Sequence, residues 1–128
     1  MKRNRPKYAA RNRAAAKARQ QYLTGQRCRL CLKRFASEVH HIAGRNAAAC
    51  DAIAAQYESE KNWLPLCREC HELIDKQTPA LWACAAKLEM GELDLDFLRS
   101  LRTGRRFAFN MAELSQAVDD LEQWRLLQ

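Results

Sequence analysis

Two Cys-x-x-Cys pairs constrain the fold of this chain more than any other feature. Cys28 and Cys31 form the first pair, Cys67 and Cys70 form the second pair, and 35 residues separate the two pairs. The two-residue spacer lets a tight turn aim both sulfur atoms at one ion, and four thiolates favour zinc over cations that prefer oxygen. Disulfides or buried core thiols are the alternatives, but no apolar leader segment points to an oxidising compartment. We therefore predict a closed, structural Zn²⁺ site.

All three histidines of the chain lie close to this cysteine pattern. His40 and His41 are adjacent and lie between the two pairs, and His71 directly follows Cys70. Neighbouring side chains of a strand point to opposite faces, so His40 and His41 should have different roles. One of them can ligate a metal while the other faces a reactant. A second metal site, distinct from the zinc site, follows from this arrangement.

The order His40-His41-Ile42, Asn62 and Cys67-x-x-Cys70-His71 resembles the HNH endonuclease motif in its zinc-knuckle-bearing version. The resemblance covers residues 26–76 and implies a ββα-metal fold, in which a hairpin and a helix enclose one divalent cation. The chain departs from the family pattern in the 20 residues between His41 and Asn62. The two strands are expected over Ser37–Ile42 and Trp63–Cys67. A small inserted helix is expected between them, over Asn46–Gln56, and the metal-bearing helix over Glu69–Lys76.

The resemblance implies a role for each matching residue. His40 and His71 would hold a catalytic divalent cation, which could be Mg²⁺, Mn²⁺ or another transition metal. His41 would be the general base that deprotonates a water molecule, a role that suits the ordinary pKa of histidine. Asn62 would brace the loop and keep the His41 imidazole aimed.

Two carboxylates near these histidines are further candidates. Asp75 follows His71 by four residues on the same helical face, and it is a weaker candidate for a metal ligand. Glu38 lies two residues before His40 on the same strand face. It could orient a metal ligand through a hydrogen bond, or it could be an ordinary solvated charge.

The positive charge of the chain is concentrated at its N-terminus. The net charge is +7, and residues 1–27 contain nine Lys and Arg residues and no acidic residue. Alanine-rich spacing favours a helix here, but only Tyr8, Tyr22 and Leu23 offer larger apolar anchors, so the arm lacks an apolar stripe for docking or for membranes. We predict that the arm grips DNA phosphates, with a solubilising tail as the alternative. The candidate phosphate contacts are Lys2, Arg3, Arg5, Lys7, Arg11, Arg13, Lys17 and Arg19.

The C-terminal part of the chain is expected to be helical and to carry no chemistry. A helix should begin with Thr78 as the N-cap and end at Gly91, and a shorter one should lie over residues 95–101. Asn110 and Glu113 form a predicted capping box for the last helix. The apolar stripe of this helix is expected to consist of Met111, Leu114, Val118, Leu121 and Trp124. Cys50 and Cys84 are expected to be buried, reduced thiols.

Together these features predict an α+β fold with a basic arm (residues 1–25), a ββα-metal core with the four-cysteine zinc site (26–77) and a helical extension packed on the core (78–128). The resemblance implies a metal-dependent endonuclease or nickase that hydrolyses double-stranded DNA, as in phage or mobile-element proteins. No segment is apolar enough to span a membrane, and a cytoplasmic location is expected. A non-catalytic, zinc-stabilised nucleic-acid-binding module and a protein whose arm binds an acidic partner are the alternatives. The sequence leaves monomer and homodimer open.

Overall fold

The computed structural model describes residues 6–44, 55–76 and 80–128, in which helices surround a two-stranded antiparallel sheet. The sheet pairs β1 (Glu38–His41) with β2 (Trp63–Leu66), so that His41 lies opposite Trp63. Both predicted strands and the α+β class are confirmed, although each strand is shorter than expected. Ladder-like hydrogen bonds continue past the ends of β1, from Ser37 N to Leu66 O (2.9 Å) and from Ile42 N to the carbonyl of Asn62 (2.8 Å).

Strand β2 is buried along its whole length because it is covered on both faces and on its outer edge. It follows directly from the short 3₁₀ turn η2 (Glu60–Asn62). Its outer edge is covered by the loop of the first cysteine pair, where Arg29 N donates to Pro65 O at 2.9 Å. The missing N–H of Pro65 is tolerated because proline is compatible with an edge strand.

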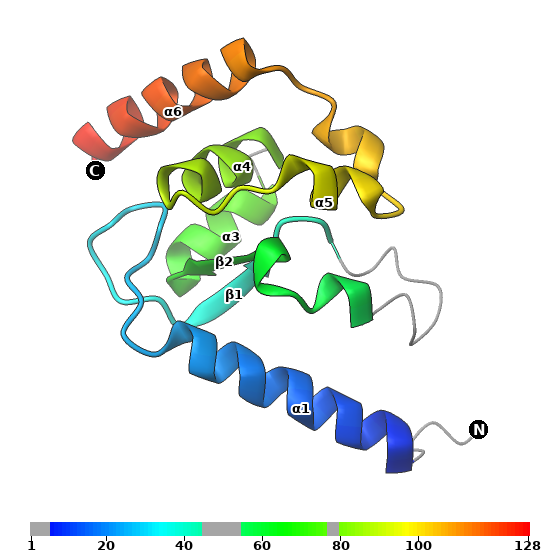
Figure 1. The fold of residues 1–128 in the computed structure, drawn as a ribbon. Coiled ribbons are helices and arrows are strands. Elements are labelled where there is room, and N and C mark those ends of the chain that lie inside the picture. The colour runs from blue at the N-terminus through cyan, green and yellow to red at the C-terminus, as the bar shows by residue number, and fades with distance from the viewer. Residues whose placement is uncertain (1–5, 45–54, 77–79) are drawn as a thin grey trace.

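The sheet lies between α1 (Pro6–Leu23) on one side and α3 (Arg68–Lys76) and α4 (Ala80–Glu89) on the other (Figure 1). The arm is helical as predicted, and its last turn is anchored on the core. Leu23 is buried, and the hydroxyl of Tyr22 donates to the carbonyl of Trp63 at 3.2 Å. Tyr22 and Leu23, at the C-terminal end of the helix, therefore form its docking point. Gly25, with a φ of +75°, lies two residues beyond the end of the helix.

A buried lysine in α4 joins these elements, and no sequence pattern indicated it. Lys87 is fully buried, and its Nζ donates to the carbonyls of Glu60 (2.8 Å) and Trp63 (2.7 Å). It also lies 3.3 Å from the hydroxyl of Tyr22 and 3.4 Å from a carboxylate oxygen of Glu92. Burial lowers the pKa of Lys87. One ammonium group thus connects α1, η2, β2 and α4.

The C-terminal helices α5 (Leu95–Ser100) and α6 (Met111–Leu126) complete the hydrophobic core, with the 3₁₀ turn η3 (Gly104–Phe107) between them. The predicted capping box at the start of α6 is confirmed, with Glu113 N donating to Asn110 Oδ1 at 2.8 Å and Asn110 N to Glu113 Oε1 at 3.0 Å. The place of Met111 in the apolar stripe is wrong. Met111 is the first residue of the helix and is 59% exposed, because the buried face runs through Leu114, Ala117 and Leu121.

Helix α6 packs along α4 and reaches back to the loop of the first cysteine pair. Trp82 and Trp124 meet edge to face, with ring centroids 6.0 Å apart. Arg125 Nε donates to Leu30 O (2.6 Å), and its Nη2 donates to Arg29 O (3.0 Å). The last turn of the last helix is therefore bonded to a segment near the start of the core.

Several expectations concern residues outside the described ranges. The helix expected over Asn46–Gln56 lies almost entirely there, and so do Cys50 and the N-cap at Thr78 and Pro79. Cys84 is buried and unpaired, and burial raises the pKa of its thiol to about 12. Within the described ranges, no helix combines the length and apolar character needed to cross a bilayer.

Candidate metal centres

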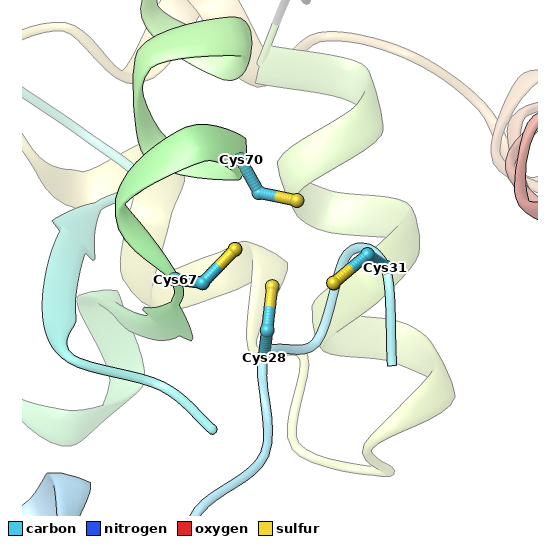
Figure 2. A group of neighbouring side chains, drawn as sticks. All are labelled: Cys28, Cys31, Cys67 and Cys70. Atoms are coloured by element: carbon cyan, nitrogen blue, oxygen red, sulfur yellow. The ribbon is translucent and has the colours of Figure 1, made fainter. Parts of the chain in front are cut away.

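The four motif cysteines come together in one buried cluster. Cys28 and Cys31 lie in the loop after α1, Cys67 directly follows β2, and Cys70 lies in the first turn of α3. Figure 2 shows their sulfur atoms converging from the loop and from the helix. The four Sγ atoms lie within 4.8 Å of one another, and all four thiols are free rather than disulfide-bonded. The cluster could hold a metal ion such as zinc, as the spacing predicted.

The first cysteine pair is shaped by a tight turn. Leu32 N donates to Cys28 O at 3.0 Å, and Leu32 has a φ of 60°, in the left-handed region. Lys33 N then points at Cys31 Sγ, at a distance of 3.4 Å. This turn aims both sulfur atoms inward and supplies one sulfur with a backbone donor.

The second pair is supported by a charged side chain. Arg34 Nε donates to Cys67 Sγ at 3.4 Å, and this bond opposes the effect of burial on the thiol. A hydrogen bond from Cys70 lowers the pKa of Cys28 to about 4, and the same bond raises the pKa of Cys70. Burial raises the pKa of Cys67 despite the bond from Arg34, so among these three thiols the thiolate form, which is the form that binds metal, is favoured at Cys28.

A second group of potential metal ligands lies apart from the cysteines. His40 of β1 meets His71 and Asp75 of α3, and one ligand atom of each lies within 4.8 Å of the others. Oxygen atoms of Asp75 lie 3.5 Å from His40 Nδ1 and 3.6 Å from His71 Nε2. Burial, helped by the nearby His71, lowers the pKa of His40 to about 4. His40 is therefore neutral at pH 7, as a metal ligand must be.

Glu38 orients this group through His71. Its Oε1 accepts a hydrogen bond from His71 Nδ1 at 2.7 Å. This bond places the proton on Nδ1 and leaves Nε2, the nitrogen nearer to Asp75, as a lone-pair donor. The carboxylate expected to support a ligand thus contacts the helix histidine rather than its strand neighbour His40.

His41 is engaged by a different set of residues from His40, as strand alternation predicted. Its Nε2 lies 2.9 Å from Glu58 Oε1. Glu58 also accepts from Trp63 Nε1 (3.3 Å) and pairs with Arg19 Nη1 (2.9 Å). An ionised Glu58 holds the proton on Nε2, so that Nδ1 of His41 is the basic nitrogen. No sequence pattern indicated Glu58, because a single acid in an insertion has no characteristic spacing.

Asn62 is a buried brace for the loop that follows β1. Its Oδ1 accepts from Ala43 N (2.7 Å), and its Nδ2 donates to Ala43 O and to Tyr57 O (both 3.0 Å). The Asn62 side chain makes no hydrogen bond to the His41 ring. It fixes the backbone two residues beyond His41.

The histidines border one cavity of about 530 Å³. His40, His41, His71 and Asp75 all line it, so the two faces of β1 contribute to a common space. Two polar residues outside the sequence motif, Thr103 and Arg106, line it as well, and no sequence pattern indicated a role for either. The cysteines do not line this cavity.

The arm residues proposed to contact DNA fall into three groups. Lys2, Arg3 and Arg5 lie outside the described residues, and Lys7 and Arg11 lie in α1. Arg13 and Lys17 are exposed on α1 and are available to a partner. Arg19 is only partly exposed and pairs with Glu58, so its first role in this fold is to position that carboxylate.

Comparisons with protein-family models, with curated proteins and with solved structures find no match to this chain.

Proposed function

We propose that this chain is a metal-dependent DNA endonuclease or nickase of the HNH type. One observation carries the proposal. His40, His71 and Asp75 form a potential cation site on the wall of a cavity that His41 also lines. A protein that only binds nucleic acid needs the cysteine cluster for stability, but it has no use for a second histidine oriented by its own carboxylate.

The two candidate metal sites would have different roles. The four cysteines would hold a structural Zn²⁺, because four thiolates leave no open position for a substrate. His40 and His71, with Asp75, would hold a catalytic divalent cation and leave positions open beside them. When bound, this cation supplies Lewis-acid stabilisation of the phosphate and of the leaving oxygen.

The residues of the chain account for the remaining chemistry of phosphodiester hydrolysis. Nδ1 of His41 takes a proton from a water molecule as the water oxygen bonds to phosphorus, and the bond from phosphorus to the sugar oxygen breaks. Glu58 stabilises the imidazolium that forms, because its carboxylate accepts from Nε2 at 2.9 Å. Asn62 holds the loop after His41 so that the ring keeps its position. The exposed cations Arg13 and Lys17 of α1 would contact flanking phosphates.

The test combines plasmid nicking with calorimetric metal titration. Wild-type protein should nick or linearise supercoiled plasmid when Mg²⁺, Mn²⁺ or another transition metal is added. His41→Ala should lower the cleavage rate ~10²-fold or more while metal and DNA affinity stay near wild type. His71→Ala should lose metal affinity as well as activity. Gln116→Ala, on the exposed face of α6, serves as a control.

Two results would contradict the proposal. In the first, the wild type does not cleave with any divalent cation; in the second, His41→Ala cleaves normally. DNA binding without cleavage would then assign the chain to the zinc-stabilised binding modules.

A further inference from the structure

One wall of the histidine-lined cavity comes from the C-terminal extension. Thr103, Arg106 and Phe107 line the cavity together with His40, His71 and Asp75. These three residues belong to the turn η3 and its N-cap, and they lie outside the segment that resembles the HNH motif. The cavity is therefore completed by an element whose sequence carries no recognisable signature.

The backbone of this turn is fixed on both sides. Arg99 Nε donates to Phe107 O (2.9 Å), and its Nη2 donates to Phe109 O (3.0 Å). Gly104 packs so closely on α5 that a Cβ there would overlap the carbonyl of Arg99. Phe107 is buried in the core. The position of Arg106 at the cavity wall is thus set by packing and hydrogen bonds.

The side chain of Arg106 has no ion pair or hydrogen bond with any residue that the structure describes, and it is exposed to solvent. It lines the same cavity as a group of residues suited to a divalent cation. Two cations that face one space repel each other unless an anion lies between them. A guanidinium is suited to such an anion when it is a phosphate, because it can form two parallel hydrogen bonds to phosphate oxygens.

We propose that Arg106 binds the phosphodiester that is cleaved, by contacting a non-bridging oxygen of the same phosphate that faces His40 and His71. This inference rests on the proposed nuclease function and names a residue that the HNH resemblance does not supply. Asp75 offsets one of the two charges of a divalent cation at this site, whereas negative charge on the phosphate increases as water adds. Arg106 would add a positive charge beside the phosphate and so make up for the cation charge that Asp75 offsets.

Arg105 provides a matched control. It precedes Arg106 in the same turn and is also exposed, but it does not line the cavity. Arg106→Ala should lower the plasmid-cleavage rate at saturating DNA by ~10²-fold. This is the usual effect of losing one hydrogen-bond donor to the negative charge that develops in the transition state. Arg105→Ala should stay within about 3-fold of wild type, because a charge that contacts only flanking phosphate affects affinity rather than rate. Arg106→Lys should recover part of the rate, because it restores charge without bidentate geometry.

A second readout does not depend on cleavage. The affinity for a short fluorescent duplex is measured by anisotropy over a range of salt concentrations, with Ca²⁺ in place of the catalytic cation. Arg106→Ala should reduce the slope of log affinity against log salt by about one unit, which is the loss of one phosphate contact. Unchanged melting temperatures would show that all three variants are folded.

The outcomes separate the inference from the function on which it rests. A wild type that never cleaves contradicts the proposed nuclease, but the salt slope still tests Arg106. An unchanged slope in Arg106→Ala overturns the phosphate contact. Equal losses of cleavage rate in Arg105→Ala and Arg106→Ala overturn a specific role for Arg106. The loss would then be an effect of overall surface charge.

Discussion

Replacement of Asn62 by alanine should be among the most destabilising single changes in this fold. The Asn62 side chain is completely buried and satisfies three backbone groups, namely the N–H and the carbonyl of Ala43 and the carbonyl of Tyr57. Alanine leaves all three groups without a partner. Each buried unpaired group costs about 1–3 kcal/mol. We expect a total loss of about 3–5 kcal/mol, because a water molecule can enter the space and satisfy part of the set.

The assay is equilibrium unfolding in urea with zinc present, followed by tryptophan fluorescence. Asn110→Ala is the matched control, because it makes the same substitution at the exposed cap of α6 and should cost about 1 kcal/mol. Asn62→Asp should be no better than Asn62→Ala, since it keeps one acceptor but places a carboxylate against two carbonyls. If Asn62→Ala loses less stability than Asn110→Ala, the bracing role of this residue is refuted.

Four further changes test other parts of the structure. Cys67→Ser should unfold the chain or leave it insoluble, because zinc binding energy is folding energy, and a zinc-free variant that melts like wild type would contradict this. Burial lowers the pKa of Lys87, so the unfolded chain holds the proton that the native state releases. Stability should therefore rise with pH from that lowered pKa to about 10, and Lys87→Met should abolish the rise in urea titrations at several pH values. Glu58→Gln should slow cleavage about 10-fold and change its pH profile, and an identical profile would exclude a role in orienting His41. Removal of residues 1–17, which spares the docked Arg19, should flatten the salt dependence of DNA binding without lowering the melting temperature; an unchanged slope would make the arm a mere tail.

The features that could be predicted from the sequence are those that short spacings determine. The Cys-x-x-Cys pairs identified the buried cluster because each pair fits one turn. The alternation of strand residues separated His40 from His41, and the three-residue spacing of Asn110 and Glu113 identified the start of α6. Each of these patterns depends on backbone geometry within a few residues, so it can be recognised in the sequence before the fold is known.

The features that were missed depend on contacts between distant segments. Lys87 looks like an ordinary surface charge in an alanine-rich helix, and only the fold brings two carbonyls and a tyrosine hydroxyl to its ammonium group. Glu58 and Arg106 are likewise single charged residues, whose surroundings are set by β1 and by η3. The spacing of Met111 fits the apolar stripe, yet Met111 is the first residue of its helix and faces outward. Local pattern cannot distinguish these cases from solvated side chains.

The bonds from Arg125 to the loop of the first cysteine pair have a consequence for the order of folding. The residues that these two bonds join are separated by 95 and 96 positions in the sequence. The cysteine cluster closes a much shorter loop, of 35 residues. A longer loop costs more entropy to close, and non-local contacts form more slowly. We therefore expect metal capture to organise the sheet and α3 first, with docking of α6 as a later kinetic phase. Until α6 docks, the carbonyls of Arg29 and Leu30 lack their guanidinium partner, and the apolar face of α4 that contacts α6 remains open to other chains.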